Sequence, residues 1–249
     1  FPRVSGFVLV TGAGRRVGAG IARRLARDGW TIGVHYNSSR EGAEDVASAI
    51  RADGGAAALF RADLTDQSAT DTMTSQIAKR GDWVGLINSA ASFEPDDIES
   101  FAFPRAEAQL KLNLLAPVYL ARALAAAKPA HGFVINIADQ KVLNPNPDFL
   151  SYTLAKLGLA SATATLAMAL APAIRVNCIA PGLMLPSGEQ SEENFARVHD
   201  QTLTGKGATP ADVAEAAGYL ANARALTGQM LAIDGGQHLV KSARDVMFS

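Results

Sequence analysis

The sequence predicts a single α/β domain with a doubly wound, mostly parallel sheet of seven strands. Short β-branched runs alternate with longer helical patterns along the chain, which is typical of βαβ units packed around a parallel sheet. No linker divides the chain, and 249 residues with a 48% hydrophobic fraction are enough for one large core. We therefore treat residues 1–249 as one domain.

Strands and helices are expected in alternation, because short β-branched runs alternate with longer helical patterns. In the first half, strands are expected at Phe7–Thr11, Thr31–His35 and Ala56–Arg61, and helices at Val17–Asp28, Glu41–Asp53 and Asp66–Arg80. In the second half, strands are expected at Val84–Asn88, Phe133–Ile137, Ile174–Ile179 and Met230–Ile233, and helices at Arg105–Ala127, Ser151–Leu170 and Ala211–Asn222. The segment Met184–Thr209 lacks a sheet pattern, and a loop this long is usually functional, so a mobile substrate lid is expected at 184–209.

The balance of charge argues against polyanionic partners. The chain has 23 Lys and Arg residues against 24 Asp and Glu, a net charge of −1, and no basic patch. Neither a nucleic acid nor an anionic membrane is therefore an expected partner, and a small-molecule substrate is. The single cysteine, Cys178, excludes an internal disulfide and a cysteine-rich zinc site, so no metal is expected. It fits a reducing compartment, and the first residues lack a signal-peptide profile, so we expect a cytoplasmic protein.

One apolar stretch approaches the length of a membrane-spanning helix. Leu157–Ile174 carries no charged residue. Its alanines and polar residues such as Ser161 and Thr163 make it only weakly apolar, and Pro172 ends it. A core helix with two buried faces is therefore the expectation.

A glycine-rich turn carries the first chemical signal. The segment Thr11-Gly12-Ala13-Gly14-Arg15-Arg16-Val17-Gly18 follows a predicted strand and opens a predicted helix. Glycines allow a tight turn and the close approach of a ligand, and the helix N-terminus favours a phosphate. In a βαβ context this predicts a Rossmann dinucleotide site, with contacts at Gly12, Arg15, Arg16, Val17 and Gly18. An ordinary strand-to-helix turn is the alternative.

The end of the second strand indicates which dinucleotide is bound. An NAD site usually places an acid there for the ribose 2′-hydroxyl, but this sequence has His35, Tyr36, Asn37, Ser38, Ser39 and Arg40. Together with Arg15 and Arg16, these donors suit a 2′-phosphate, so the sequence predicts NADP(H). The alternative is that the arginines are only solvated. Asp63, after the third strand, either holds the adenine amino group or shapes its turn, and both readings stay open.

Tyr152 and Lys156 are the candidates for proton chemistry. They are four residues apart on a predicted helix, so they lie on one face within mutual reach. A phenol with an ordinary pKa near 10 is a poor acid at neutral pH, and a nearby ammonium is expected to lower that pKa. Tyr152 then becomes a usable proton donor.

These residues resemble the short-chain dehydrogenase/reductase family along essentially the whole chain. Beyond the glycine-rich turn, the resemblance is carried by Asp63-Leu64, Asn88-Ser89-Ala90-Ala91, Asn113, Tyr152 with Lys156, Pro181-Gly182 and Asp234-Gly235-Gly236. It implies that Asn113 holds a water for proton relay and that Lys156 also binds the nicotinamide ribose. It further implies cofactor contacts at Asp63, Leu64, Asn88, Ser89, Ala90, Pro181, Gly182 and Leu183.

Two departures from the family pattern are informative. Arg16 stands where the motif usually has its middle glycine, and Asp139 stands where the usual catalytic serine precedes the tyrosine. With His35-Tyr36 and the segment from Asn88 to Phe93, they resemble the pteridine reductase branch, including dihydromonapterin reductases, which uses NADPH. In that branch Phe93 would stack on a flat heterocycle opposite the nicotinamide. A plain loop hydrophobe is the alternative for Phe93, and a turn residue is the alternative for Asp139.

The expected reaction is NADPH-dependent reduction of a pteridine-like C=N bond. Such a reduction needs hydride on carbon and a proton on nitrogen, and Asp139 in a buried site can assist that protonation. Burial favours the protonated acid and Lys156 opposes it, so its charge state stays open. The alternatives are a carbonyl reductase of the 3-oxoacyl-carrier type and a non-catalytic dinucleotide sensor. A nucleic-acid binder has the least support.

Assembly is expected because two helices are apolar on nearly every side. Arg105–Ala127 and Ser151–Leu170 carry alanines and leucines that one sheet face cannot bury. A symmetric partner presenting the same two helices would cover them, which predicts a homodimer, or a homotetramer built from two such dimers.

Overall fold

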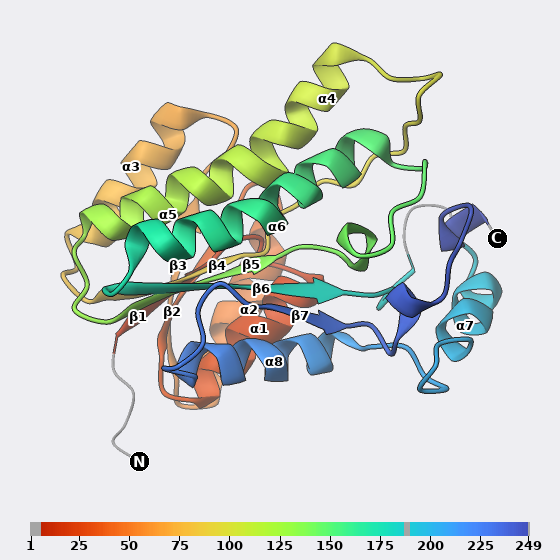
Figure 1. The fold of residues 1–249 in the computed structure, drawn as a ribbon. Helices are drawn as coiled ribbons and strands as arrows, with labels where there is room; N and C mark the ends of the chain where they lie inside the picture. Colours follow the sequence, from red (N-terminus) through yellow and green to blue (C-terminus); the bar gives the residue numbers. More distant parts are fainter. Residues whose placement is uncertain (1–5, 187–189, 249) are drawn as a thin grey trace.

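A sheet of parallel strands runs through the centre of the computed structural model, which describes residues 6–186 and 190–248 (Figure 1). In these residues the strand order is β3-β2-β1-β4-β5-β6-β7, and every neighbouring pair is parallel. The strands are β1 (Phe7–Val10), β2 (Thr31–Tyr36), β3 (Ala56–Arg61), β4 (Trp83–Asn88), β5 (Gly132–Ile137), β6 (Ile174–Pro181) and β7 (Met230–Ile233). The predicted seven-stranded, doubly wound Rossmann sheet is confirmed, and its pairing is parallel throughout the described residues.

Helices cover both faces of this sheet. One face carries α1 (Arg16–Arg27), α2 (Arg40–Ala52) and α8 (Pro210–Asn222). The other face carries α3 (Gln67–Ala78), α4 (Phe103–Leu110), α5 (Ala116–Ala126) and α6 (Leu150–Leu170). A further helix, α7 (Glu192–Asp200), lies beyond the carboxyl ends of the strands, near the C-terminal segment (Figure 1).

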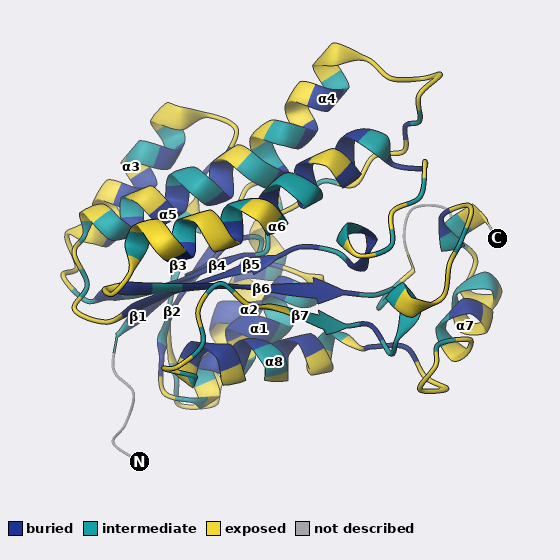
Figure 2. Ribbon diagram, viewed as in Figure 1, coloured by how far each residue is buried: buried dark blue, intermediate teal, exposed yellow. Residues whose placement is uncertain are grey.

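The alternation of side chains along β1 builds a core on each face. Val8 and Val10 pack into one core with α1, α2 and α8, whereas Phe7 and Leu9 pack into the other with α3 and α5. All four side chains are fully buried, and the central strands are correspondingly dark in Figure 2. Because successive strand side chains point to opposite faces, a parallel strand covered on both faces must be continuously apolar.

The strand order reverses at β1. The chain moves outward from β1 to β3 and then returns to place β4 on the other side of β1. The connections after β1 and β4 therefore leave the sheet in opposite directions and open a crevice at its carboxyl edge. Segments far apart in the sequence meet at this edge.

Arg175 on β6 holds the C-terminal end of α8. Its Nη1 donates to the carbonyl oxygens of Leu220 (2.9 Å) and Ala223 (3.0 Å), and its Nη2 donates to that of Ala221 (2.8 Å). The last carbonyls of a helix lack partners within it and carry partial negative charge, so a guanidinium satisfies both needs. Since α8 packs on α1, this contact also supports the helix that starts at the glycine-rich turn.

The predicted helix Arg105–Ala127 is interrupted. It consists of α4, a π-helical turn at Lys111–Leu115, and α5. Pro117 has no N–H to donate to the carbonyl of Asn113, four residues earlier, so the regular α-helical ladder cannot pass this point. The sequence pattern of apolar residues continues across the turn, which is why the interruption escaped prediction.

The expectation of an irregular lid over Met184–Thr209 is wrong in part, because α7 lies within it. Ser191 caps this helix by accepting a hydrogen bond from the Asn194 N–H (3.1 Å), and acidic residues occupy its first turn. These are helix-start signals that the polar composition concealed. Residues 187–189 of the predicted lid lie outside the described residues.

The apolar stretch singled out in the sequence belongs to α6. This is the one helix in the described ranges that is long and apolar enough, by length and composition, to cross a membrane. It packs against β6 and α4, and eight of its residues are buried, including Tyr152 and Lys156. Its outward face nevertheless exposes Leu154 and Met168.

Candidate active site

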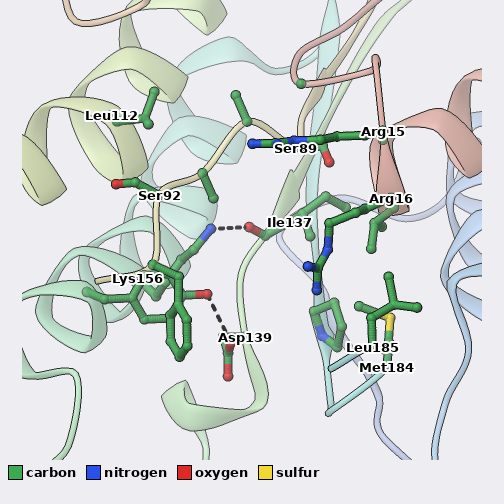
Figure 3. A pocket seen from close by; sticks show the side chains of 18 of the residues that line it. Arg15, Arg16, Ser89, Ser92, Leu112, Ile137, Asp139, Lys156, Met184 and Leu185 are labelled. Atoms are coloured by element: carbon green, nitrogen blue, oxygen red, sulfur yellow. Dashed lines mark hydrogen bonds between the residues drawn. The ribbon is translucent and has the colours of Figure 1, made fainter. Parts of the chain in front are cut away.

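A cavity of about 780 Å³ opens at the carboxyl edge where the strand order reverses. Its volume is in the range of ligand sites. Figure 3 shows Arg16 opposite Lys156, with Met184 and Leu185 on the side of Arg16 and Asp139 nearer to Lys156. Most of the predicted site residues line this cavity: Gly12, Arg15, Arg16, Val17, Gly18, His35, Tyr36, Asn37, Ser38, Asp63, Leu64, Ser89, Ala90, Phe93, Asp139, Tyr152, Lys156, Pro181, Gly182 and Leu183.

His35 positions the glycine-rich turn. The Gly12 N–H donates to His35 Nδ1 (3.1 Å), and His35 Nε2 lies 3.1 Å from the carbonyl oxygen of Ala62. Both contacts are satisfied when the proton is on Nε2, so the neutral ring joins the turn to the loop after β3. Burial lowers the pKa of His35 from 6.5 to about 4, which favours this neutral form.

The turn itself is closely packed. A Cβ on Gly18 would lie 2.4 Å from the carbonyl oxygen of Gly12, and a Cβ on Gly12 would lie 2.9 Å from the Cα of Ala90. Neither position accepts a side chain, so the backbone at the start of α1 stays accessible to the cavity. This is the geometry that the N-terminus of a helix needs to hold a phosphate.

Arg16 adopts a backbone conformation that favours glycine. Its φ is +51°, in the left-handed region, at the position where the family pattern usually has glycine. The side chain reaches the segment after β6, where Nη2 donates to the carbonyl oxygen of Pro186 (3.2 Å). A cation is thus held at the cavity despite the local cost of the backbone.

Arg40, expected to contact the cofactor, does not line the cavity in this structure. Arg40 is the first residue of α2, and its guanidinium turns outward to pair with Glu44 one turn later (2.7 Å). Asn37 and Ser38, which precede the helix, do line the cavity, and no carboxylate follows β2 directly. Arg15 and Arg16 are therefore the arginines that line the cavity beside Asn37 and Ser38.

Asp63 has a defined structural role and also lines the cavity. It accepts hydrogen bonds from the Thr65 side chain (2.7 Å) and the Thr65 N–H (2.9 Å). These bonds, the side-chain one foremost, lower the pKa of Asp63. The turn-shaping reading is therefore supported by geometry.

Asn88 supports the site through hydrogen bonds without lining the cavity. Its amide donates to Asn136 Oδ1 on β5 (2.8 Å), and Asn136 in turn donates to Thr163 on α6 (3.0 Å). Asn88 is buried and does not line the cavity, contrary to expectation. The following N–H groups of Ser89 and Ala90 donate to Thr11 Oγ1 (2.9 and 3.0 Å), which fixes this loop against β1.

Asn113 is also outside the cavity lining. Its amide donates to the carbonyl oxygen of Ser92 (3.1 Å) and to Gln109 Oε1 (2.8 Å), and the residue is fully buried. It sits in the π-helical turn, where Pro117 leaves its main-chain carbonyl without the usual helical bond. Its role as a ligand of a relay water, implied by the resemblance, stays a prediction.

Asp139 and Tyr152 form the polar centre of the cavity. The Tyr152 hydroxyl donates to Asp139 Oδ2 (2.9 Å), and the N–H of Lys141 donates to Asp139 Oδ1 (2.9 Å). Burial raises the pKa of Asp139 above its usual value, although these bonds and the nearby Lys141 and Lys156 oppose that rise. The carboxyl is thus favoured to hold a proton more than an exposed aspartate would.

The expected lowering of the Tyr152 pKa by Lys156 is wrong for this structure. Lys156 Nζ donates to the carbonyl oxygen of Ile137 (2.7 Å) and lies 5.6 Å from the centre of the tyrosine ring. Burial, followed by the charge and hydrogen bond of Asp139, raises the Tyr152 pKa well above its usual value. Burial also lowers the pKa of Lys156 to about 8. Tyr152 is therefore a neutral proton carrier bound to a carboxyl, not an activated phenolate.

Phe93 belongs to an aromatic cluster at one end of the cavity. Its ring stacks on Phe149, with centroids 3.9 Å apart, and meets the Tyr152 ring edge-on at 4.8 Å. One face of Phe93 is therefore already covered, and a flat ligand could stack only on the other. The reading as an isolated loop hydrophobe is not supported.

Several lining residues carried no signal in the sequence. They come from the segment after Asp139 and from the C-terminal tail, defined here as residues 240–248: Gln140, Lys141, Asp245, Val246 and Met247, with Gln237 just before the tail. No periodic pattern or motif marks them, and the tail residues reach the cavity only through the return of the chain past β7.

The residues present fit a dinucleotide. Close-packed glycines, a helix N-terminus and the cations Arg15 and Arg16 converge on one end, and Asp139, Tyr152 and Lys156 on the other. Within residues 6–186 and 190–248 no group of three or more His, Cys, Asp or Glu side chains is arranged to hold a metal ion. The arrangement can bind phosphates and hold or deliver a proton.

Comparison with known proteins places the chain among oxidoreductases. A family model described as enoyl-(acyl carrier protein) reductase matches residues 12–238. Among solved structures, the FolM alternative dihydrofolate reductase 1 of Brucella suis, in complex with NADP, superimposes with a TM-score of 0.89 at 38% sequence identity. That match covers 96% of this chain and 97% of the other.

Two curated relatives are named for different reactions. The 3β-hydroxysteroid dehydrogenase 1 of Eggerthella lenta is 32% identical over 243 residues, which is 93% of each chain. The dihydromonapterin reductase of Klebsiella pneumoniae is 25% identical over 237 residues, covering 93% of this chain and 96% of the relative.

The buried His35 predicts a pH dependence of stability. Its pKa is lower in the folded chain (about 4) than the ordinary 6.5, so the unfolded chain takes up the proton first as the pH falls. The contribution of His35 is therefore complete above pH 6.5 and is lost as the pH falls toward 4, by about 3 kcal/mol at most. Urea unfolding of wild type and His35→Gln between pH 4 and 7.5 measures the difference, and parallel curves for the two proteins would contradict this role.

Proposed function

The chain belongs to the short-chain dehydrogenase/reductase family, and we propose that it is an NADPH-dependent reductase of a pteridine-like C=N bond. The observation that carries the proposal is the Asp139 carboxyl, hydrogen-bonded to the Tyr152 hydroxyl at 2.9 Å where the family pattern usually has a serine. A carboxyl can give a proton to a ring nitrogen, whereas a serine hydroxyl is suited to a carbonyl oxygen.

The cofactor assignment rests on the charge at the adenosine end. Arg15 and Arg16 are the chain's own partners for a 2′-phosphate, with Asn37 and Ser38 as further donors. The N–H groups of the glycine-rich turn would hold the pyrophosphate, and Lys156 the nicotinamide ribose. When bound, NADPH supplies the hydride. The Brucella suis relative crystallised with NADP supports the same assignment.

The chain supplies the proton. As the C=N bond is reduced, its nitrogen takes up one proton, and the nearest protonated groups are the Asp139 carboxyl and the Tyr152 hydroxyl that donates to it. Burial raises the pKa of both groups, which keeps the proton in the site until the nitrogen becomes basic enough to accept it. Solvent then restores the proton to the pair.

The alternative is reduction of a carbonyl. The steroid dehydrogenase relative and the description of the family model favour it, and Tyr152 could serve either oxygen or nitrogen. The relatives named for dihydrofolate and dihydromonapterin favour the C=N substrate. A sensor without turnover leaves the Asp139–Tyr152 pair without a purpose. The described part of Met184–Thr209 remains the proposed lid, since Met184, Leu185 and Gln190 line the cavity.

We expect a marked preference for NADPH over NADH that depends on Arg16. Arg16→Gly should lower the ratio of kcat/KM for NADPH to that for NADH about tenfold, because one cation at the 2′-phosphate is lost. The free energy of unfolding should not fall, since glycine adopts a φ of +51° freely. Arg40→Ala is the matched control and should leave the ratio unchanged. Equal efficiency of the wild type with both cofactors would refute the assignment.

Asp139 should decide between the two substrate classes. With NADPH, Tyr152→Phe should lose turnover about 100-fold or more on any substrate. Asp139→Ser should lower kcat/KM for dihydrobiopterin about tenfold or more while sparing or improving reduction of an acetoacetyl thioester. The two substrates are compared in parallel assays. An equal loss on both substrates would assign Asp139 a structural role. If the wild type turns over neither substrate, the sensor is favoured.

We further propose that the chain forms a homodimer, or a tetramer of two such dimers, through α5 and α6. Leu115, just before α5, is 56% exposed, and Leu154 and Met168 on α6 are 49% and 75% exposed; a second copy would cover all three. Ala164 is exposed on α6, so Ala164→Glu should leave the monomer folded and break assembly, whereas Ala52→Glu on α2 should not. Light scattering at micromolar concentration measures this, and a monomeric wild type would contradict it.

A further inference from the structure

A buried ion pair forms part of the cavity wall beside the reaction centre. Lys141 Nζ lies 2.7 Å from Asp245 Oδ2, and the two side chains are 2% and 11% exposed. The same ammonium donates to Asn146 Oδ1 (2.7 Å). Both Lys141 and Asp245 line the cavity, although they are 104 residues apart in the sequence.

The tail that carries Asp245 is fastened to the loop between β5 and α6. Arg244 pairs with Asp148 (2.8 Å), and the N–H of Asp245 donates to the same carboxylate (2.6 Å). Beyond this point Phe248 stacks on Phe149, with centroids 5.8 Å apart and planes 15° apart. Figure 1 shows the C-terminal segment returning to the end of the sheet where α6 begins. The tail is thus docked on the loop that joins Asp139 to Tyr152.

The ion pair is directly coupled to the proposed proton donor. The N–H of Lys141 donates to Asp139 Oδ1 (2.9 Å), so the lysine is held beside that carboxyl by its own backbone. The charged or titratable groups around Asp139 are Lys141 on the turn after β5, Tyr152 and Lys156 on α6, and Asp245 on the tail; Cys178 on β6 acts on Lys156.

We propose that Asp245 and Lys141 are positioning residues that together keep the Asp139 carboxyl able to hold its proton, an inference that rests on the proposed function. Paired with Asp245, the ammonium of Lys141 presents little net charge to its neighbour. Left alone, it would stabilise the Asp139 carboxylate and empty the donor before substrate arrives. Asp245 left alone would do the reverse, and its charge already acts to raise the pKa of Tyr152.

The arrangement makes the C-terminal tail part of the reaction centre. Without the tail, Lys141 would keep Asn146 and the Phe149 ring, 5.5 Å from its ammonium, but would lose its carboxylate partner, and a buried charge without its counter-ion is costly. The donor therefore keeps its proton only when the last residues of the chain are docked.

The test measures the titration of Asp139 itself. In the cofactor-free protein the carboxyl carbon of Asp139 is followed by ¹³C NMR, with Asp139→Asn assigning its signal. Asp245→Asn should lower the pKa of Asp139 and Lys141→Met should raise it, each by about one pH unit. The double variant should return it to near the wild-type value. Asp245→Glu, which keeps the charge, should titrate like wild type.

A structural role alone would not give this pattern. Loss of tail docking would move both single variants in the same direction or neither, and that result overturns the inference. Glu107→Gln, which removes one partner of the exposed Glu107–Lys111 pair (2.8 Å), is the matched control and should leave the Asp139 titration unchanged. Urea unfolding at pH 7 verifies that each variant is folded, and where one single variant does not fold, the opposite shift expected of the other single variant carries the test.

A second measurement separates this inference from the proposed function. With NADPH and dihydrobiopterin, activity should decline as the pH rises through the pKa of Asp139, and Asp245→Asn should move that decline to lower pH while Lys141→Met moves it to higher pH. If the wild type reduces no C=N bond, the proposed function fails, and the NMR titration still decides whether the pair controls Asp139.

Discussion

The reversal of strand order at β1 is the constraint on which the site depends. Because all neighbouring strands in the described residues are parallel, their carboxyl ends meet at one edge, and the connections after β1 and β4 diverge there. The glycine-rich turn, the Ser89–Ala90 loop and Asp139 follow three different strands, yet they meet at this edge. No local motif could bring them together without the sheet.

Several ionisable side chains at the site are buried. His35 is neutral, Asp139 is favoured to keep a proton, and Lys156 has a pKa lowered to about 8, all because the surrounding protein disfavours their charged forms. For Asp139 and Lys156 the shift brings the pKa nearer to neutral pH, which favours proton transfer. The hydrogen-bond partners of all three side chains are main-chain atoms and the Tyr152 hydroxyl, so these polar groups are satisfied by neutral partners.

The sequence predicts the fold well because the signals for it are local. Short apolar, β-branched runs mark the strands, and the glycine-rich turn marks the start of α1. The departures from prediction involve distance or direction. Arg40 adjoins Ser38 in sequence, but the start of α2 turns it outward, and Asp245 reaches Lys141 only through the tertiary fold. The Lys156 ammonium was expected at the phenol, yet the carbonyl oxygen of Ile137 takes its hydrogen bond.

The two positions that depart from the family pattern are both unfavourable for local stability. Arg16 holds a left-handed backbone that costs a residue with a side chain roughly 1 kcal/mol or more, and Asp139 places a carboxyl where burial opposes its charge. Glycine at position 16 and serine at position 139 would be easier to accommodate. Because both residues line one cavity, at its two ends, the simplest physical account is that the chain accepts these costs for binding and proton transfer. The unfavourable backbone of Arg16 and the unfavourable burial of Asp139 thus occur where the site needs a cation and an acid.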